Sequence, residues 1–163
     1  QVLRLGSEEA AMDYAKALHP NILQYTKYGS ASGPMAGRGE IAVSIIFSHD
    51  CIANIDEGYE DLAVVFPADG TGYEIGAQAL IANAPHPNNA KTWIDWALQA
   101  DTQSIGPEVR AFQLPTNPEA EVSEFAVDIS QVNLVDYDFQ AAGEARTRLT
   151  EQFEDEVAAA PAE

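Results

Sequence analysis

The stretch Ile41–Asn54 reads IAVSIIFSHDCIAN and decides how the rest of the chain is interpreted. Its first part, Ile41–Phe47, is apolar or small except for Ser44. Such a run has the length of a strand and is typical of one covered on both faces, as in α/β sheets. His49 and Asp50 follow almost directly. Because open α/β sheets bind ligands beyond the carboxyl ends of their strands, we expect these two side chains to face a ligand.

Apolar runs and amphipathic patterns alternate along the chain. Apolar runs predict further strands at residues 62–66 and 75–81 and a short strand at 132–135. Helical spacing predicts helices at Glu8–Leu18 after Ser7, at Pro87–Gln99 and from Phe139 to about Val157 after Asp138, with short ones near Pro34 and at Asp50–Gly58. Strands that alternate with helices predict an α/β fold with a largely parallel sheet.

Composition and charge bound the class of protein. With 163 residues, 46% of them hydrophobic, the chain is long enough for one domain with a core. It carries 26 acidic and 8 basic residues, and this acidic surface repels nucleic acid and anionic lipid, so neither is an expected partner. The sequence contains no apolar run long enough to span a membrane, and the single cysteine allows no intrachain disulfide. Because it begins at Gln1 rather than Met, we expect that a segment upstream has been removed.

Pattern alone leaves two interpretations of His49 and Asp50 open. Either they face a ligand, or Asp50 caps the helix that follows and His49 is a rim residue with its hydrogen bonds satisfied. The nearby stretch YGSASG offers the hydroxyls of Ser30 and Ser32 and several unblocked backbone N–H groups. If a helix starts near Pro34, this loop would cradle an anion; otherwise it is a turn.

Glu74 lies in the glycine-rich stretch GTGYEIG, residues 70–76, at the edge of a predicted strand. Glycine at positions 70 and 72 lets the backbone approach another group closely. The order G-x-G-x-x-x-G precedes a strand and opens no helix, so it does not match the dinucleotide-binding fingerprint. The sequence therefore does not predict nucleotide binding.

Five blocks occur in an order and spacing that resemble a known family. They are NILQYTKYGSASGPMAGRGEIAVSIIFSHD (21–50), VVFPADGTGYEIGAQALI (64–81), NNAKTWIDWAL (88–98), LPTNPEA (114–120) and VDYDFQAAGEARTRL (135–149). Together they resemble the extracytoplasmic solute-binding proteins of bacterial ABC transporters. The nearest group is often described as ferric-iron binding and also contains phosphonate and sugar-phosphate binders. The resemblance covers residues 10–157, but members of the family are roughly twice as long, so this chain resembles their C-terminal half only.

The resemblance implies an α/β fold of the type II periplasmic-binding-protein kind, in which two lobes joined by crossing strands enclose a ligand. It implies that residues 1–62 are part of the second lobe and that residues 63–163 are the crossover and the C-terminal portion of the first lobe. A half of such a fold leaves sheet edges uncovered, so we expect pairing with the missing N-terminal half or with a second copy. The family also implies a periplasmic or otherwise extracytoplasmic location, a membrane permease as partner, no cofactor and no enzymatic activity.

The resemblance further implies which residues hold the ligand. In the sugar-phosphate binders of this group, a His-Asp pair and a later Glu hold sugar hydroxyls, while small hydroxyl residues at helix N-termini hold the phosphate. The matching positions here are His49, Asp50 and Glu74 for the hydroxyls and Ser30, Ala31 and Ser32 for the phosphate. A carboxylate accepts hydrogen bonds from hydroxyl groups, and an imidazole donates or accepts one. The expected ligand is a small polar anion such as a sugar phosphate or a phosphonate.

Ferric iron is an alternative ligand within the same family. Its iron binders typically use adjacent tyrosines as phenolate ligands together with a bound anion. Here Tyr25 and Tyr28 are three positions apart and no Tyr-Tyr pair exists, although Asp50 and Glu74 offer hard oxygen ligands. We interpret the two tyrosines as wall or core residues, because a tyrosine is amphipathic.

Two alternatives belong to other functional classes. The His-Asp pair is also a feature of HD-type metal phosphohydrolases, which need further His and Asp ligands around the metal. The remaining histidines, His19 and His86, both lie beside prolines in expected loops, which does not favour such an enzyme. The chain could instead be a half-domain that dimerises through its exposed edge and binds no ligand. Phosphatase turnover would indicate the first alternative, and a stable dimer without a ligand response the second.

Overall fold

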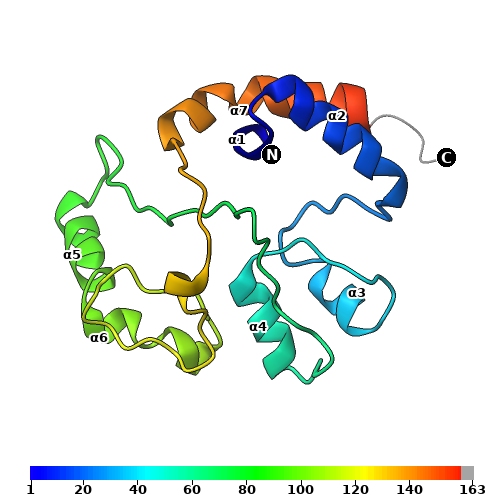
Figure 1. Cartoon of the computed structure of the whole chain (residues 1–163). Helices are drawn as coiled ribbons and strands as arrows, with labels where there is room; N and C mark the ends of the chain where they lie inside the picture. The colour runs from blue at the N-terminus through cyan, green and yellow to red at the C-terminus, as the bar shows by residue number, and fades with distance from the viewer. Residues whose placement is uncertain (159–163) are drawn as a thin grey trace. The chain divides into compact units, whose positions relative to one another are not determined.

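The structure, a computed structural model, describes residues 1–158 and divides the chain into two compact units (Figure 1). The first unit contains residues 1–27, 65–73 and the segment from 130 onward; the second contains 28–64 and 74–129. The length is enough for one domain with a core, and the structure distributes the chain over two compact units. This division does not test the expected assignment of residues 1–62 and 63–163 to lobes of a larger protein. Within the described residues, no helix is both long and apolar enough to cross a membrane.

The first unit is built on two capped helices. Its elements are α1 (Val2–Leu5), α2 (Glu8–Leu18), η1 (His19–Asn21), α7 (Phe139–Phe153) and the π-turn η4 (Glu154–Ala158), with η3 (Ile129–Gln131) at the point of entry. The Ser7 hydroxyl accepts from the Ala10 N–H at 3.1 Å, and the Asp138 carboxylate accepts from the Ala141 N–H at 3.0 Å. Both caps satisfy an N–H that the first turn of a helix leaves free. The predicted starts of both helices are therefore confirmed.

Helices α2 and α7 with η4 pack against each other in the first unit (Figure 1). The buried residues of these elements are Ala11 and Met12 in α2 and Val157 in η4. At the surface the Arg148 guanidinium donates to both carboxylate oxygens of Glu8, each at 2.7 Å. Exposed ion pairs contribute little to stability, so burial of apolar residues in α2 and η4 stabilises this unit more than the arginine fork does.

None of the four predicted strands pairs into a sheet within residues 1–158. Backbone pairing in the first unit is limited to an isolated parallel bridge between Thr71 and Leu134. There the Thr71 N–H donates to the Asn133 carbonyl at 2.9 Å and the Val135 N–H donates to the Thr71 carbonyl at 3.0 Å. A strand exists only where a neighbouring strand accepts and donates its hydrogen bonds, so an apolar run cannot form one without a partner.

The segment Ile41–Phe47 shows the consequence. Its apolar side chains were expected to be covered on both faces, but Val43 and Ile45 are 77% and 83% exposed. Ser44 and Ile46 alternate with them and are half-buried. This alternation with a period of two is that of a strand with one covered face. The correction is that one face of the segment is covered, and not both.

The second unit is formed by short helices. They are α3 (Gly33–Gly37), α4 (Ser48–Asp56), α5 (Pro87–Ala97), α6 (Ala100–Gln103) and η2 (Gly106–Val109). Helix α4 begins two residues before the predicted start at Asp50, and α5 ends two residues before the predicted end at Gln99. Helix α5 buries none of its residues, and Trp93 on it is 61% exposed. The core of this unit gathers instead around α4, which buries Cys51, Ile52 and Asn54.

Two glycines let α3 approach α4 and the residues after it. A Cβ at Gly33 would lie 2.5 Å from Nδ2 of Asn54, and a Cβ at Gly37 would lie 2.5 Å from the ring of Tyr59. Glycines four positions apart share one face of a helix, so both point at the same neighbour. This close packing places α3 against the second half of α4 and the residues that follow it.

Gly37→Ala is expected to lower the free energy of unfolding by about 1–3 kcal/mol, because the added methyl group must displace an aromatic ring. Gly143→Ala in α7 is the matched control, since nothing lies within 4 Å of its Cβ position. There the alanine should raise stability by about 0.5–1 kcal/mol through its better helix propensity. Urea denaturation of both variants measures the difference, and equal effects would show that Tyr59 does not pack on α3.

Candidate functional site

His49 and Asp50 lie in the first turn of α4 and face each other. Nε2 of His49 is 3.7 Å from Oδ1 of Asp50, and the two side chains are 25% and 24% exposed. The cap position of the helix is Phe47, whose side chain makes no capping hydrogen bond. The interpretation of Asp50 as the helix cap is therefore wrong, because the helix already begins at Ser48. The first N–H groups of a helix have no intrahelical acceptor, so donors and a carboxylate meet at this end of α4.

Phe47 connects the pair to the serine-containing loop. Its ring stacks on the His49 imidazole with centroids 5.3 Å apart and planes inclined by 11°. A Cβ at Gly29 would lie 3.5 Å from the Phe47 ring, an ordinary van der Waals contact. Sequence reasoning missed Phe47 as a site residue, and its place just before the pair was the only signal for it.

The loop Ser30–Ser32 is joined to the apolar run by a hydroxyl pair. Oγ of Ser32 and Oγ of Ser44 are 2.6 Å apart, which explains the one polar residue in that run. The Ala31 N–H donates to the Tyr28 carbonyl and the Gly33 N–H to the Ser30 carbonyl, each at 3.2 Å. These two N–H groups are engaged in turns, and the expectation that the other N–H groups of the loop cradle an anion stays a prediction. Ser30 and Ala31 are exposed and Ser32 is half-buried.

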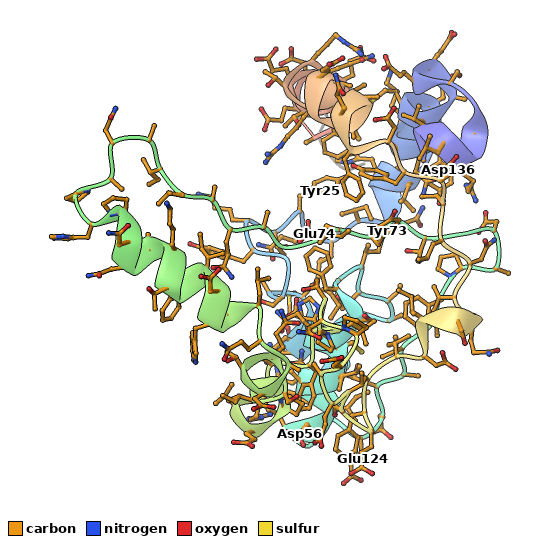
Figure 2. The ribbon with its side chains drawn as sticks, turned by 90° about the vertical axis from the view of Figure 1, so that its left-hand side faces the viewer. Tyr25, Asp56, Tyr73, Glu74, Glu124 and Asp136 are labelled. Atoms are coloured by element: carbon orange, nitrogen blue, oxygen red, sulfur yellow. The ribbon has the colours of Figure 1, made fainter. Side chains whose placement is uncertain are left out.

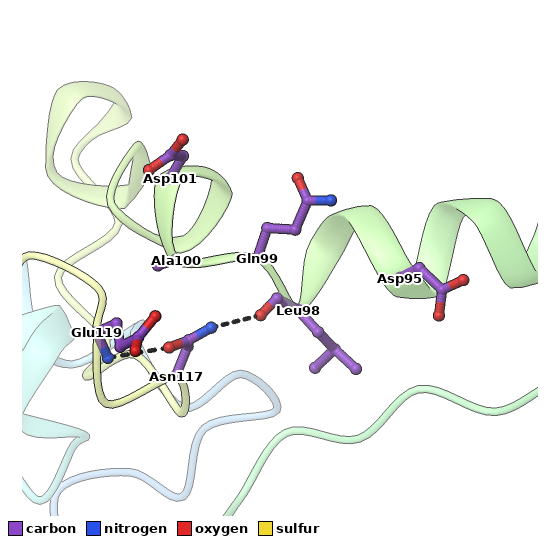
Figure 3. Close-up of a pocket in the computed structure, with 7 residues that line it drawn as sticks. All are labelled: Asp95, Leu98, Gln99, Ala100, Asp101, Asn117 and Glu119. Atoms are coloured by element: carbon purple, nitrogen blue, oxygen red, sulfur yellow. Dashed lines mark hydrogen bonds between the residues drawn. The ribbon is translucent and has the colours of Figure 1, made fainter.

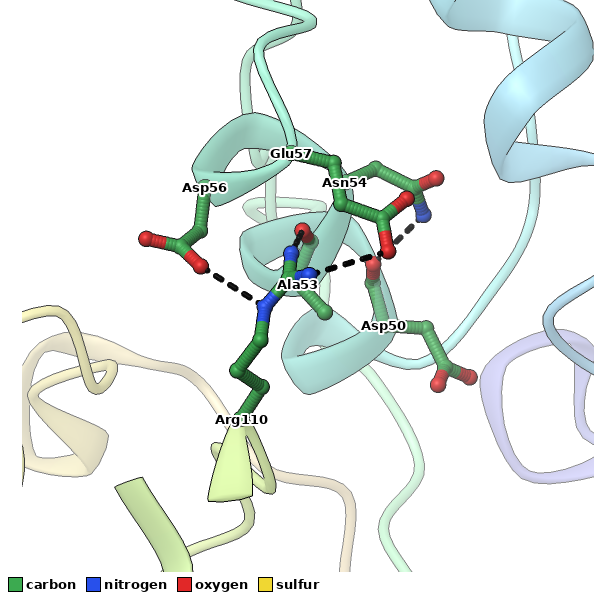
Figure 4. Close-up of polar contacts among 6 residues, drawn as sticks. All are labelled: Asp50, Ala53, Asn54, Asp56, Glu57 and Arg110. Carbon is green, nitrogen blue, oxygen red and sulfur yellow. Dashed lines mark hydrogen bonds and ion pairs between the residues drawn. The ribbon is translucent and has the colours of Figure 1, made fainter. Parts of the chain in front are cut away.

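Asn54 is a second residue that sequence reasoning missed. It is buried, and its Nδ2 donates to the backbone carbonyl of Asp50 at 2.6 Å (Figure 4). The same nitrogen lies against Gly33 at the end of the serine loop. Asn54 is four positions after Asp50 and so shares its helix face, which is the sequence signal that could have identified it.

Arg110 holds the other end of α4. Its guanidinium donates to Oδ2 of Asp56 at 2.9 Å and to the Ala53 carbonyl at 3.0 Å, and it lies 3.3 Å from Oε1 of Glu57 (Figure 4). A cation at a helix C-terminus is favourable, because the last carbonyls there lack intrahelical donors. Arg110 adopts a left-handed backbone with φ of 63°. No local sequence pattern could have predicted this contact, since it joins positions more than fifty residues apart.

Glu74 is exposed and makes no hydrogen bond or ion pair with the other residues of the described chain (Figure 2). It follows Tyr73, where the chain passes from the first unit to the second. The Tyr73 ring packs against Phe139 in the first unit, with centroids 5.5 Å apart. The structure thus brings the serine loop and the His49–Asp50 pair together in the second unit, and the place of Glu74 beside them stays a prediction.

A hollow of about 510 Å³ lies beside α5 and α6 in the second unit (Figure 3). Its lining residues are Asp95, Leu98, Gln99, Ala100, Asp101, Asn117 and Glu119. The Asn117 amide donates to the Leu98 carbonyl at 2.8 Å and accepts from the Glu119 N–H at 2.9 Å. Three carboxylates with no cation among the lining residues repel an anion, so this hollow does not fit the expected ligand.

Tyr25 and Tyr28 belong to different compact units. The Tyr25 hydroxyl lies 3.0 Å from Nδ1 of His19, and its ring packs edge-on against Phe153 at 5.3 Å. Burial raises the pKa of the Tyr25 phenol, whereas a phenolate ligand must lose its proton. Tyr25 therefore serves as a packing residue of the first unit, in agreement with its sequence interpretation. Residues 1–158 contain no group of three or more His, Cys, Asp or Glu side chains placed to hold a metal ion.

Cys51 directly follows the His49–Asp50 pair and is buried. Burial raises the pKa of its thiol, so the reactive thiolate is scarce at neutral pH. We expect N-ethylmaleimide to label Cys51 of the native protein at least about tenfold more slowly than in urea. Fast labelling that increases through neutral pH would contradict this and indicate a thiol activated by His49.

The comparisons with known proteins identify the family. Residues 4–130 match the family model described as "Bacterial extracellular solute-binding protein". The chain belongs to this family, and the resemblance seen in the sequence is confirmed. It is 37% identical over 158 residues to an uncharacterized protein of Haemophilus influenzae, covering 95% of this chain and 45% of that protein. The chain thus spans less than half the length of this curated relative.

Two solved structures resemble the chain closely. One is the periplasmic binding protein AfuA from Actinobacillus pleuropneumoniae with exogenous fructose-6-phosphate bound, at 39% identity and a TM-score of 0.89. The other is the periplasmic binding protein P5PA, at 34% identity and a TM-score of 0.85. The similarity covers 98% and 96% of this chain and 50% of each neighbour. The likeness to half of a periplasmic-binding-protein fold is therefore confirmed, whereas the expected α/β sheet is not formed within residues 1–158.

Proposed function

We propose that this chain is part of the substrate-binding component of an ABC importer and that its ligand is a small polar anion, a sugar phosphate or a phosphonate. The observation that supports this most is its similarity, at 39% identity over nearly its whole length, to AfuA with fructose-6-phosphate bound. We propose that it binds the ligand and does not convert it chemically, which is supported by the description of its relatives as binding proteins.

The arrangement in the second unit supports a site in which two groups of side chains hold different parts of the same ligand. The hydroxyls of Ser30 and Ser32, with Ala31 between them, hold the phosphate or phosphonate group. His49 and Asp50 hold hydroxyls of the uncharged part, where an ionised carboxylate accepts and an imidazole donates or accepts. Contact between the two groups through Phe47 supports this assignment. Glu74 completes the hydroxyl-binding group.

We infer the partners from the fraction of its relatives' length that this chain spans, which is about half. Residues 1–62 form part of the second lobe of a two-lobe protein, and residues 63–163 form the crossover and the C-terminal portion of the first lobe. The polypeptide of the N-terminal half completes both lobes, and a second copy of this chain is the alternative partner. The complete protein delivers its ligand to a membrane permease from the periplasm or another extracytoplasmic space, as the family description and both neighbours support.

Isothermal titration of a protein of the relatives' full length that contains this chain tests the function. Fructose 6-phosphate should bind, and fructose and inorganic phosphate should each bind more weakly, because each engages only one of the two groups. Methylphosphonate in place of inorganic phosphate distinguishes a phosphonate binder. Binding of ferric iron without any sugar phosphate, or steady release of phosphate from the sugar phosphate, would contradict the proposal and indicate the iron binder or the phosphohydrolase.

A further inference from the structure

Asn54 is a buried amide that lies between the two parts of the proposed site. Only 6% of its surface is exposed, and its Nδ2 donates to the Asp50 carbonyl at 2.6 Å. A Cβ on Gly33 would come within 2.5 Å of that nitrogen and 3.2 Å of the Asn54 Cγ. One side chain therefore contacts both the turn that carries His49 and Asp50 and the end of the loop Ser30–Ser32.

The space for a Cβ on Gly33 is tight on two sides. Besides Nδ2 of Asn54 at 2.5 Å, the same Cβ position is 3.2 Å from Cδ1 of Ile46, so a methyl group there must displace both neighbours. Asn54 also resists movement, because a buried amide that leaves its acceptor loses a hydrogen bond without gaining water. Gly29, before the serine loop, differs, since its Cβ position is 3.5 Å from Phe47 and leaves room for a methyl group.

We propose that Asn54 is a positioning residue that fixes the distance between the phosphate-binding loop and the hydroxyl-binding pair, with Gly33 as the contact that sets this distance. The inference rests on the proposed function, in which Ser30–Ser32 and His49–Asp50 hold opposite ends of one ligand. A sugar phosphate that touches both groups depends on their spacing. Inorganic phosphate touches the loop alone and does not depend on it.

Gly33→Ala in the full-length protein tests the proposal by titration with fructose 6-phosphate and with inorganic phosphate. The methyl group pushes the loop and α4 apart, so affinity for fructose 6-phosphate should fall about tenfold or more, while that for inorganic phosphate stays within about twofold. Gly143→Ala in α7 is the control, because nothing lies within 4 Å of its Cβ position and it lies outside the proposed site. It should leave both affinities near those of the wild-type protein.

A double-mutant cycle separates positioning from a general loss of structure. Asn54→Ala removes the amide and makes room for the methyl group at position 33, so it should itself weaken fructose 6-phosphate binding selectively. Adding Gly33→Ala to it should change affinity by less than about twofold, since the two substitutions act on one contact. Where Gly33→Ala alone does not fold, Asn54→Ala carries the test, because it removes the contact without creating a clash.

The outcomes distinguish this inference from the proposed function. If the wild-type protein binds fructose 6-phosphate and the variants bind it equally well, Asn54 has no positioning role although the function stands. Equal weakening of both probes would likewise overturn the role, because it would place the damage in the loop itself. If the wild-type protein binds neither of these probes nor methylphosphonate, the proposed function is wrong and the positioning role is wrong with it, even where urea denaturation shows that Gly33 and Asn54 are coupled. Binding of methylphosphonate alone would leave the function as that of a phosphonate binder and overturn the positioning role, which requires a ligand with hydroxyls.

Discussion

Asp50→Asn and Glu74→Gln should each weaken binding of fructose 6-phosphate to the full-length protein by about ten- to a hundredfold. The physical reason is that an ionised carboxylate accepts hydrogen bonds from sugar hydroxyls more strongly than a neutral amide does. Inorganic phosphate should bind almost as before, because it presents no carbon-bound hydroxyl and meets only the serine loop. Titration calorimetry with the two ligands measures both effects in one preparation.

Asp95→Asn is a matched control for these substitutions. It removes the same charge from the same unit, but Asp95 lies on α5 in the acidic hollow rather than in the proposed site. It should leave both affinities unchanged, which separates local hydrogen bonding from the effect of net charge. Equal weakening of both ligands by Asp50→Asn would instead place the cluster at the anion. No effect from either site variant would make His49 and Asp50 ordinary rim residues.

The helices could be predicted because their signals are local. Ser7 and Asp138 precede apolar stripes of helical period, and both side chains accept the expected backbone N–H. Proline at the first position of α5 likewise marks its start. Each of these signals concerns residues within one or two turns, so no information about the rest of the fold is needed to interpret it.

Strand pairing could not be predicted in the same way, because it depends on where another segment lies. The run Ile41–Phe47 has the composition of a buried strand, yet in the structure its odd-numbered residues Val43 and Ile45 face outward. The composition of a segment indicates that it is suited to burial. Whether both of its faces are buried depends on which other segments pack against it. The bridge at Thr71 was missed for the related reason that threonine and glycine resemble a turn.

The candidate site was predictable to the extent that it is contiguous in sequence. The pair His49 and Asp50 and the serine loop are short motifs, and the structure shows them within one unit. What joins them comes from packing: Phe47 stacks on the imidazole, and Asn54 lies against a glycine beyond the loop. Arg110 is the extreme case, since it reaches α4 from a distant loop and only the folded chain reveals it. The motifs therefore indicate the groups that we propose to touch a ligand, and the fold shows which residues pack against them.

Produced alone, this chain is expected to associate or to bind 8-anilinonaphthalene-1-sulfonate strongly rather than to behave as a closed, ligand-competent monomer. The physical reason is the apolar surface that it leaves uncovered. Val65 and Ile81, on two other predicted strands, are 81% and 77% exposed, as Val43 and Ile45 are on the first. Segments whose backbone N–H and C=O groups lack partners and whose side chains are apolar pair readily with another chain.

Supplying the remaining half of the protein, as a second chain or in one polypeptide, should abolish dye binding and give a single species by analytical ultracentrifugation. Trp93 and Trp96 provide an internal reporter, because both are exposed on α5 and their emission should shift to shorter wavelength when a covering surface arrives. A dimer of the isolated chain that excludes the dye would instead indicate that a second copy covers the same segments. A compact monomer that excludes the dye and binds fructose 6-phosphate would show that these apolar segments need no partner, and would contradict the proposed two-lobe assembly.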